Sequence, residues 1–163
     1  MKTLTRTGLA AVAVILLAAP GRAEDQPADG KKVVLFVCEH GAAKSVIAAA
    51  RFNQRAHDKK IPYRAIAKGT DPQEELSEAA RKGLQADGLA ASPSRPERLT
   101  AGDAAAASRV VTLGCDISKV APNVHAESWA DVPAPSQGGY AATRDAIDRH
   151  IDALLAELDR PKK

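Results

Sequence analysis

The sequence contains few aromatic residues and no long hydrophobic run. Only two Phe, two Tyr and one Trp occur among 163 residues, and basic residues do not alternate with aromatic ones. The longest apolar stretch, residues 9–19, is shorter than the roughly 20 residues that a membrane-spanning helix needs. These absences give no indication of a nucleic-acid partner or of a bilayer-spanning segment.

The first 23 residues have the pattern of a secretory signal peptide. Lys2 and Arg6 form a basic start, residues 9–19 form the apolar region, and Gly21 and Ala23 are the small residues of a cleavage site. We expect cleavage after Ala23 and an exported protein, periplasmic in a Gram-negative organism, without membrane contact after cleavage. An uncleaved N-terminal anchor is the alternative.

Charge does not point to a polyanionic partner. The sequence has 23 basic and 20 acidic residues, but Lys2, Arg6 and Arg22 belong to the predicted signal peptide, which leaves 20 of each sign in the remainder. Residues 24–30 are polar and contain proline, so we expect a flexible tether. Residues 31–160 are sufficient for one domain with its own core.

Alternating hydrophobic patterns predict an α/β fold for this domain. Apolar, β-branched runs predict strands at 32–37, 63–67 and 109–114, and helical spacing predicts helices at 45–58, 73–86, 100–108 and 140–158. Segment 89–99 is predicted as a loop or short edge strand, and the proline-containing segment 116–139 as a long functional loop. The alternation predicts a single-domain parallel sheet of about four strands with helices on both faces.

The segment 33–45, Val-Val-Leu-Phe-Val-Cys-Glu-His-Gly-Ala-Ala-Lys-Ser, is the most informative part of the sequence. A buried strand ends on Cys38, and a short loop leads directly into a helix. Backbone N–H groups of such a loop and the positive end of the helix dipole stabilise an oxyanion or a thiolate. We therefore expect Cys38 to be a nucleophile beside an anion-binding loop made of Glu39, His40, Gly41, Ala42 and Ala43.

This segment resembles the C-x5-R-S signature of the low-molecular-weight protein tyrosine phosphatases and of the arsenate reductases of the same fold. Lys44 stands where the family has arginine. Segments 67–70, 110–116 and 129–133 resemble further family motifs in the expected order. The resemblance covers about residues 32 to 158 and implies the phosphatase I-like fold.

The resemblance also implies a role for individual residues. Cys38 attacks a phosphoryl group, the loop amides and Lys44 hold its oxygens, and Ser45 helps the sulfur leave. Asp131 protonates the leaving oxygen. Lysine offers one compact charge where arginine offers two parallel hydrogen bonds, so we expect anion binding with poorer alignment. Glu39 opposes anion binding unless it faces solvent.

Residue-level alternatives remain open beside these roles. Ser45 is also a reasonable helix cap, and Lys44 a solvated residue on the first helical turn. Asp131 is equally consistent with an ordinary loop position, because Val132 separates it from the proline that follows the aspartate directly in the family. Trp129 is expected to be a core or loop anchor and not a substrate platform.

The second cysteine, Cys115, allows two interpretations. In an oxidising compartment Cys38 and Cys115 form a structural disulfide. Alternatively, Cys115 is the resolving thiol of an arsenate reductase that depends on a thiol reductant, although the third cysteine of those enzymes is missing.

Three functional hypotheses follow from these features: a cysteine-dependent phosphatase acting on a phosphorylated substrate, an arsenate reductase, and a non-catalytic domain that binds a phosphate-like oxyanion. Lys44 and Glu39 favour the third. Cys38, His40, Cys115 and His125 are chemically suitable metal ligands, but their spacing matches no recognised zinc motif, and we expect neither a metal nor a cofactor.

Overall fold

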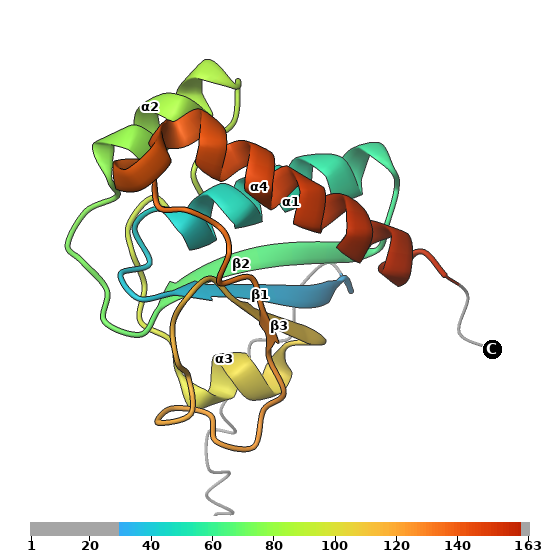
Figure 1. Ribbon diagram of the computed structural model, residues 1–163. Helices are drawn as coiled ribbons and strands as arrows, with labels where there is room; N and C mark the ends of the chain where they lie inside the picture. Colours follow the sequence, from blue (N-terminus) through green and yellow to red (C-terminus); the bar gives the residue numbers. More distant parts are fainter. Residues whose placement is uncertain (1–29, 161–163) are drawn as a thin grey trace, which may run out of the picture.

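The computed structural model describes residues 30–160, which form a four-stranded parallel sheet between layers of helices (Figure 1). The strands are β1 (Lys32–Cys38), β2 (Tyr63–Gly69), β3 (Arg109–Thr112) and β4 (Glu127–Ser128), in the order β2-β1-β3-β4. Every neighbouring pair is parallel. The predicted fold class is therefore confirmed, whereas the predicted signal peptide and all of the tether except Gly30 lie outside the described residues.

Helices cover both faces of the sheet, as the alternation predicts. They are α1 (Lys44–Asp58), α2 (Glu78–Ala86), α3 (Ala101–Ala106) and α4 (Pro135–Leu158). In Figure 1, α1, α2 and α4 lie on one side of the sheet and α3 lies on the other. No helix within residues 30–160 is long and apolar enough to cross a membrane.

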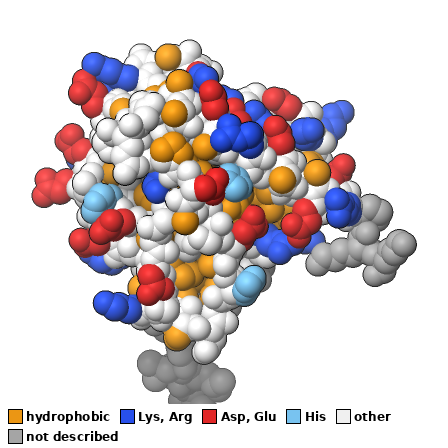
Figure 2. All heavy atoms as spheres, viewed as in Figure 1, with side chains coloured by type: hydrophobic (Ala, Val, Ile, Leu, Met, Phe, Trp, Pro, Cys, Tyr) orange, Lys and Arg blue, Asp and Glu red, His pale blue; other side chains and the backbone are white. Residues whose placement is uncertain are grey.

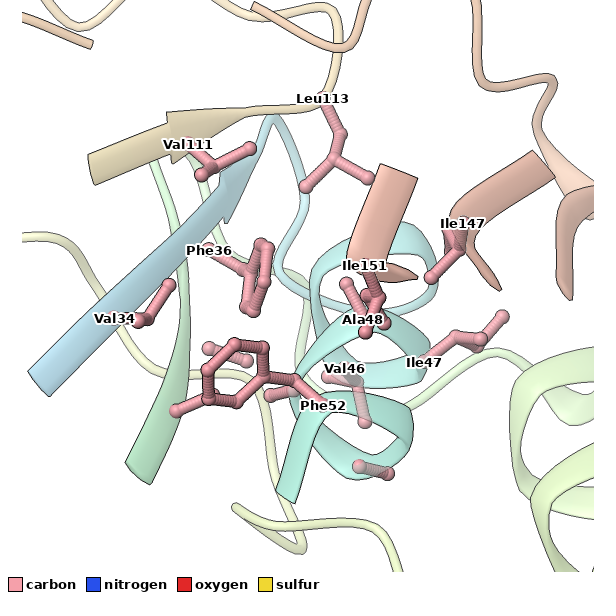
Figure 3. Close-up of a cluster of buried hydrophobic side chains, with 14 of the residues drawn as sticks. Val34, Phe36, Val46, Ile47, Ala48, Phe52, Val111, Leu113, Ile147 and Ile151 are labelled. Carbon is pink, nitrogen blue, oxygen red and sulfur yellow. The ribbon is translucent and has the colours of Figure 1, made fainter. Parts of the chain in front are cut away.

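The central strand β1 divides the core into two hydrophobic clusters. Because successive side chains of a strand point to opposite faces, Val34 and Phe36 pack towards α1 and α4, and Leu35 and Val37 pack towards α3. Figure 3 shows Phe36 against Phe52 of α1 in the larger cluster. Burial of each such side chain stabilises the fold by about 1.5–3 kcal/mol. This packing fixes the end of β1 in the middle of the sheet.

Helices α2 and α4 depart from their predicted bounds, and capping side chains mark the starts of α2 and α3. α2 begins at Glu78, later than predicted, because the Ser77 side chain accepts the N–H of Ala80. A capping box at Thr100 sets the start of α3. α4 begins at Pro135, before the predicted start, and its backbone is broken at Gly139, where φ is +75°.

The two-residue strand β4 lies inside the segment that the sequence predicts as a long loop. It pairs with Val111 and Thr112 of β3, so it extends the sheet at its edge. The carboxyl ends of β1, β2 and β3 meet at one edge of this sheet, which is where open α/β folds place their sites.

Candidate active site

Cys38 ends β1 at the carboxyl edge of the sheet and is buried. Its Sγ lies 3.1 Å from Oγ of Ser45, which is fully buried in the first turn of α1. A hydroxyl at this distance can donate to a thiolate, and this contact joins the cysteine to the helix that follows the loop. The structure therefore brings these two predicted site residues together.

Two glycines allow the loop after Cys38 to pass close to the end of β2. Gly41 adopts φ +59°, which is costly for other residues. Gly69 faces it so closely that a Cβ on Gly69 would lie 2.7 Å from the backbone nitrogen of Gly41. The path of the loop therefore depends on both residues lacking a side chain.

The carbonyl groups of the loop are held from outside by the segment that follows β2. The N–H groups of Thr70, Asp71, Gln73 and Ser77 donate to the carbonyl oxygens of Cys38, Glu39, His40 and Ala42, at 2.8 to 3.2 Å. Because the C=O and N–H of a trans peptide point in opposite directions, the amides that follow these carbonyls face away from this segment.

Those amides have no hydrogen-bond partner among the protein groups of residues 30–160. In the described part of the chain, no hydrogen bond joins the N–H groups of residues 39–46 to a protein acceptor. The first turn of α1 also has no side-chain cap and no acidic residue. A run of unpaired donors at a helix N-terminus is suited to bind a tetrahedral oxyanion.

Lys44 supplies a positive charge beside these unpaired N–H groups. It is the first residue of α1, and its Nζ donates to the carbonyl oxygen of Val132 at 3.3 Å. A Cβ on Gly114 would lie 3.2 Å from the same nitrogen. The lysine thus reaches across to the segments that follow β3 and β4.

A pocket of about 470 Å³ opens over Cys38 and Lys44. Its walls are Cys38, Glu39, His40, Ala42, Ala43, Lys44, Gln73, Ser77, Ala79, Leu113, Gly114, Ala134, Pro135 and Ser136. The pocket thus contains the predicted nucleophile, the predicted cation and most of the predicted loop. No Phe, Tyr or Trp from residues 30–160 lines it.

Glu39 and His40 lie on the outer part of the loop. The Glu39 side chain is 68% exposed, and its carboxylate is 3.9 Å from Nε2 of His40. Exposure to solvent screens its repulsion of an anion in the pocket. The other ring nitrogen of His40, Nδ1, is 3.4 Å from the carbonyl oxygen of Asp71.

Asp131 is not one of the pocket residues in the described chain. Its carboxylate accepts hydrogen bonds from Nε2 of His150, at 2.9 and 3.0 Å, and this contact lowers the pKa of Asp131. The His150 ring stacks on Trp129, with centroids 4.7 Å apart. A carboxylate held in this way favours its ionised form, which cannot donate a proton.

Cys115 lies half-buried after β3, with its Sγ 3.5 Å from the carbonyl oxygen of Val37. Burial, with a smaller contribution from the charge of Cys38, raises the pKa of the Cys115 thiol to about 11, and the charge of Lys44 opposes the rise. Cys38 and Cys115 are both free thiols. The structure therefore gives no support to the predicted permanent disulfide.

The hypothetical metal ligands are not gathered into one site. Within residues 30–160, no three His, Cys, Asp or Glu side chains lie where they could hold a metal ion. Cys38, His40, Cys115 and His125 thus do not form a common site.

Sequence reasoning missed the part that His150 plays around Asp131. His150 lies on α4, three residues after the buried Ile147, so the helical pattern places it at the margin of the apolar stripe. A position at this margin is the sequence feature that indicates a partly buried His150. Its contacts with Trp129 and Asp131 join segments that no local pattern connects. The predicted core position of Trp129 is confirmed, since its side chain is buried against Phe36.

Comparison with known proteins places these features in context. Residues 33–163 match the family described as low molecular weight phosphotyrosine protein phosphatase. No curated protein matches the chain. Solved structures similar to this chain include YfkJ from Bacillus subtilis, with a TM-score of 0.72 and 19% identity over 82% of this chain and 98% of that one.

Two further structures illustrate the range of activities on this fold. A thioredoxin-dependent arsenate reductase from Corynebacterium glutamicum, Cg_ArsC1', has a TM-score of 0.65 and 26% identity, over 80% of this chain and 63% of that one. The tyrosine phosphatase Wzb from Escherichia coli K30, in complex with sulphate, has a TM-score of 0.58 and 17% identity, over 76% and 99%. The identities below 25% establish a common fold only.

Proposed function

Because the chain belongs to the low molecular weight phosphotyrosine protein phosphatase family, we propose that it is a cysteine-dependent phosphomonoesterase with Cys38 as its nucleophile. The observation that carries this proposal is the position of the Cys38 sulfur, beside Ser45 and at the start of a run of unpaired backbone N–H groups. The sulphate complex of Wzb supports an oxyanion as the bound group.

The reaction has two displacements at phosphorus. The Cys38 thiolate attacks the phosphoryl group, so that an S–P bond forms as the P–O bond to the leaving group breaks, and the leaving oxygen takes up a proton. Water then attacks the phosphorus, the S–P bond breaks, and phosphate leaves while Cys38 recovers its thiolate. No oxidant or reductant is needed.

Each neighbouring group has a defined part in these steps. The amides of residues 39–46 and the Lys44 ammonium stabilise the negative oxygens of the transferred group. The Ser45 hydroxyl donates a hydrogen bond to the Cys38 sulfur as the S–P bond breaks, which stabilises the departing thiolate. One ammonium aligns the oxygens less tightly than a guanidinium, so we expect modest turnover.

Arsenate reduction is the second candidate, favoured by the 26% identity to Cg_ArsC1' and by Cys115 near the site. There the Cys38 thiolate attacks arsenate, so that an S–As bond forms as one As–O bond breaks and that oxygen leaves as water after protonation. The Cys115 thiolate then attacks the Cys38 sulfur. A disulfide forms, and arsenic leaves as arsenite with the electron pair of the S–As bond. An external thiol reductant must then reopen the disulfide. The pKa of about 11 for Cys115 makes this thiol a poor nucleophile at neutral pH.

A parallel assay of purified protein distinguishes the candidates. Phosphate release from p-nitrophenyl phosphate and thiol-dependent loss of arsenate are measured for wild type, Cys38→Ser and Cys115→Ser. The phosphatase proposal predicts phosphate release that Cys38→Ser abolishes and Cys115→Ser spares. Arsenate loss that needs both cysteines, without phosphate release, would favour the reductase. Sulfate binding without either reaction would favour the non-catalytic domain.

A further inference from the structure

The Lys44 ammonium needs a fixed position if it is to bind an oxyanion together with the backbone N–H groups of residues 39–46. This ammonium stands on a flexible stem, so it keeps one position only where a fixed acceptor receives it. The acceptor in this structure is the carbonyl oxygen of Val132, at 3.3 Å. The position of that carbonyl group therefore influences where the positive charge lies beside the pocket.

Val132 lies in a short turn between β4 and α4 whose two ends are fixed. At the start, the N–H of the buried Trp129 donates to the carbonyl oxygen of Thr112 at 2.8 Å. At the end, the carbonyl oxygen of Pro133 accepts the hydroxyl of the buried Thr143 at 3.0 Å. The Val132 N–H closes the turn by donating to the carbonyl oxygen of Trp129 at 3.3 Å. The middle of the turn is exposed, so another group must hold it.

His150 of α4 contacts this turn in two ways. Its Nε2 donates to both carboxylate oxygens of Asp131, in the middle of the turn, at 2.9 and 3.0 Å. Its ring stacks on Trp129, with centroids 4.7 Å apart and planes inclined by 15°. The neighbouring Ile147 and Ile151 of α4 are fully buried in the larger core cluster. The core thus sets the place of the His150 ring, and the ring sets the place of Asp131.

We infer that His150 is a positioning residue for the Lys44 ammonium. By holding Asp131 it fixes the turn, and the turn presents the Val132 carbonyl group that receives the ammonium. This inference rests on the proposed function, in which the ammonium binds the oxygens of the phosphoryl group. It gives Asp131 a part in the site that needs neither contact with the substrate nor transfer of a proton.

Binding of inorganic phosphate tests this role without turnover. Isotope-labelled protein is titrated with phosphate, and the dissociation constant is obtained from the NMR shifts of the backbone amides of residues 39–46. His150→Phe keeps an aromatic ring but removes the donor, and Asp131→Ala removes the acceptor. His57→Phe is the matched control, because His57 is an exposed histidine of α1 that pairs with the aspartate after it and does not line the pocket.

We expect His150→Phe and Asp131→Ala each to weaken phosphate binding about fivefold, the effect of one lost hydrogen bond, and His57→Phe to change it less than about 1.5-fold. His150→Gln, whose amide still donates, should stay within about twofold of wild type. Added to Lys44→Ala, His150→Phe should weaken binding no further, because the ammonium that it positions is gone. A general distortion of the fold would move the backbone N–H groups and would weaken binding in that background too.

Other results would overturn the inference. Tighter phosphate binding in Asp131→Ala would show that this carboxylate repels the anion and does not support the turn. An equal loss from His150→Phe with and without Lys44 would show that the effect does not pass through the ammonium. Unchanged binding in both single variants, beside phosphate release that depends on Cys38, would overturn the positioning role alone. Wild-type protein that neither binds phosphate nor releases it from an ester would overturn the proposed function and this role with it.

Discussion

We propose that Lys44 sets how tightly the pocket holds a tetrahedral anion. Its ammonium lies beside the pocket, where it donates to the carbonyl oxygen of Val132. The backbone N–H groups of residues 39–46, which are unpaired in the described chain, lie beside the same pocket. An ammonium is a compact charge on a flexible stem, whereas a guanidinium would bind two oxygens at once. We therefore expect Lys44 to support affinity for the anion but to align the reacting group poorly.

Substitution of Lys44 should separate those two properties. A charged hydrogen bond contributes about 1.5–3 kcal/mol, so Lys44→Ala should weaken competitive inhibition by phosphate at least about tenfold. Lys44→Arg should retain inhibition and raise kcat for p-nitrophenyl phosphate, because two-point recognition is restored. The two predictions are checked by measuring the inhibition constant of phosphate and kcat at fixed ionic strength. Unchanged phosphate inhibition in the alanine variant would contradict the role of Lys44 in anion binding.

Cys115 should react slowly in the folded protein. Its pKa of about 11 means that only about one thiol in a thousand is ionised at pH 8. Alkylation by iodoacetamide, followed by mass spectrometry, should be far slower than in denatured protein and should rise as pH approaches 11. Because folding raises this pKa, the contribution of the thiol to stability is complete below the unfolded pKa and is lost as pH rises. Labelling at pH 8 as fast as in denaturant would contradict this assignment.

At the scale of elements, the site depends on how closely the loop after β1 approaches the end of β2. Gly69→Ala would place a Cβ 2.7 Å from the backbone nitrogen of Gly41, so the loop must move. We expect kcat/KM to fall at least about tenfold, since amide positions set transition-state stabilisation.

Gly102→Ala is the control for this substitution. Its new Cβ would meet only Oγ1 of Thr100, at 3.7 Å, within helix α3. Activity should be unchanged, and stability unchanged or slightly higher, because alanine favours a helix. Equal activity of the Gly69 and Gly102 variants would contradict the proposed dependence on close approach.

The second part of α4 is attached to α2 through Tyr140. Its hydroxyl donates to Asp87 at 2.8 Å, and its ring lies so close to Gly83 that a Cβ there would be 2.2 Å from ring carbon. Burial and the Asp87 hydrogen bond raise the pKa of Tyr140. Arg51 and Arg144 also pair with Asp87, so this carboxylate joins α1, α2 and α4.

Tyr140→Phe should lower the free energy of unfolding by about 1 kcal/mol, because one hydrogen bond is lost while Arg51 and Arg144 still neutralise Asp87. Urea denaturation measures the free energy of unfolding of this variant and of wild type. Tyr63→Phe, at the other tyrosine of the chain, is the control. Identical unfolding midpoints for Tyr140→Phe and wild type would show that the hydroxyl contributes nothing.

At the scale of the whole molecule, the sequence predicts what depends on local pattern. The β1 run, the glycine-containing loop and the first turn of α1 have clear signatures, and they assemble as expected around Cys38. Glu127 and Ser128 have no strand signature, because they join the sheet only through β3. The His150 contact with Asp131 spans two segments, and no spacing rule predicts it.

Charge is also distributed without a dominant sign. Figure 2 shows acidic and basic side chains interspersed on the face that it presents, with apolar atoms between them. A mixed surface of this kind provides little long-range steering of an anion. In the proposed function, substrate capture therefore depends on the short-range contacts of the pocket around Cys38.

Trapping of the covalent intermediate is the most direct test. Enzyme turning over p-nitrophenyl phosphate is quenched within milliseconds, and its peptides are examined by mass spectrometry. We expect a phosphoryl group on Cys38 in wild type and a larger phosphorylated fraction in Ser45→Ala, since Ser45 assists the sulfur as it leaves. Phosphate release that continues in Cys38→Ser, or turnover without any phosphoryl group on Cys38, would contradict a phospho-cysteine mechanism.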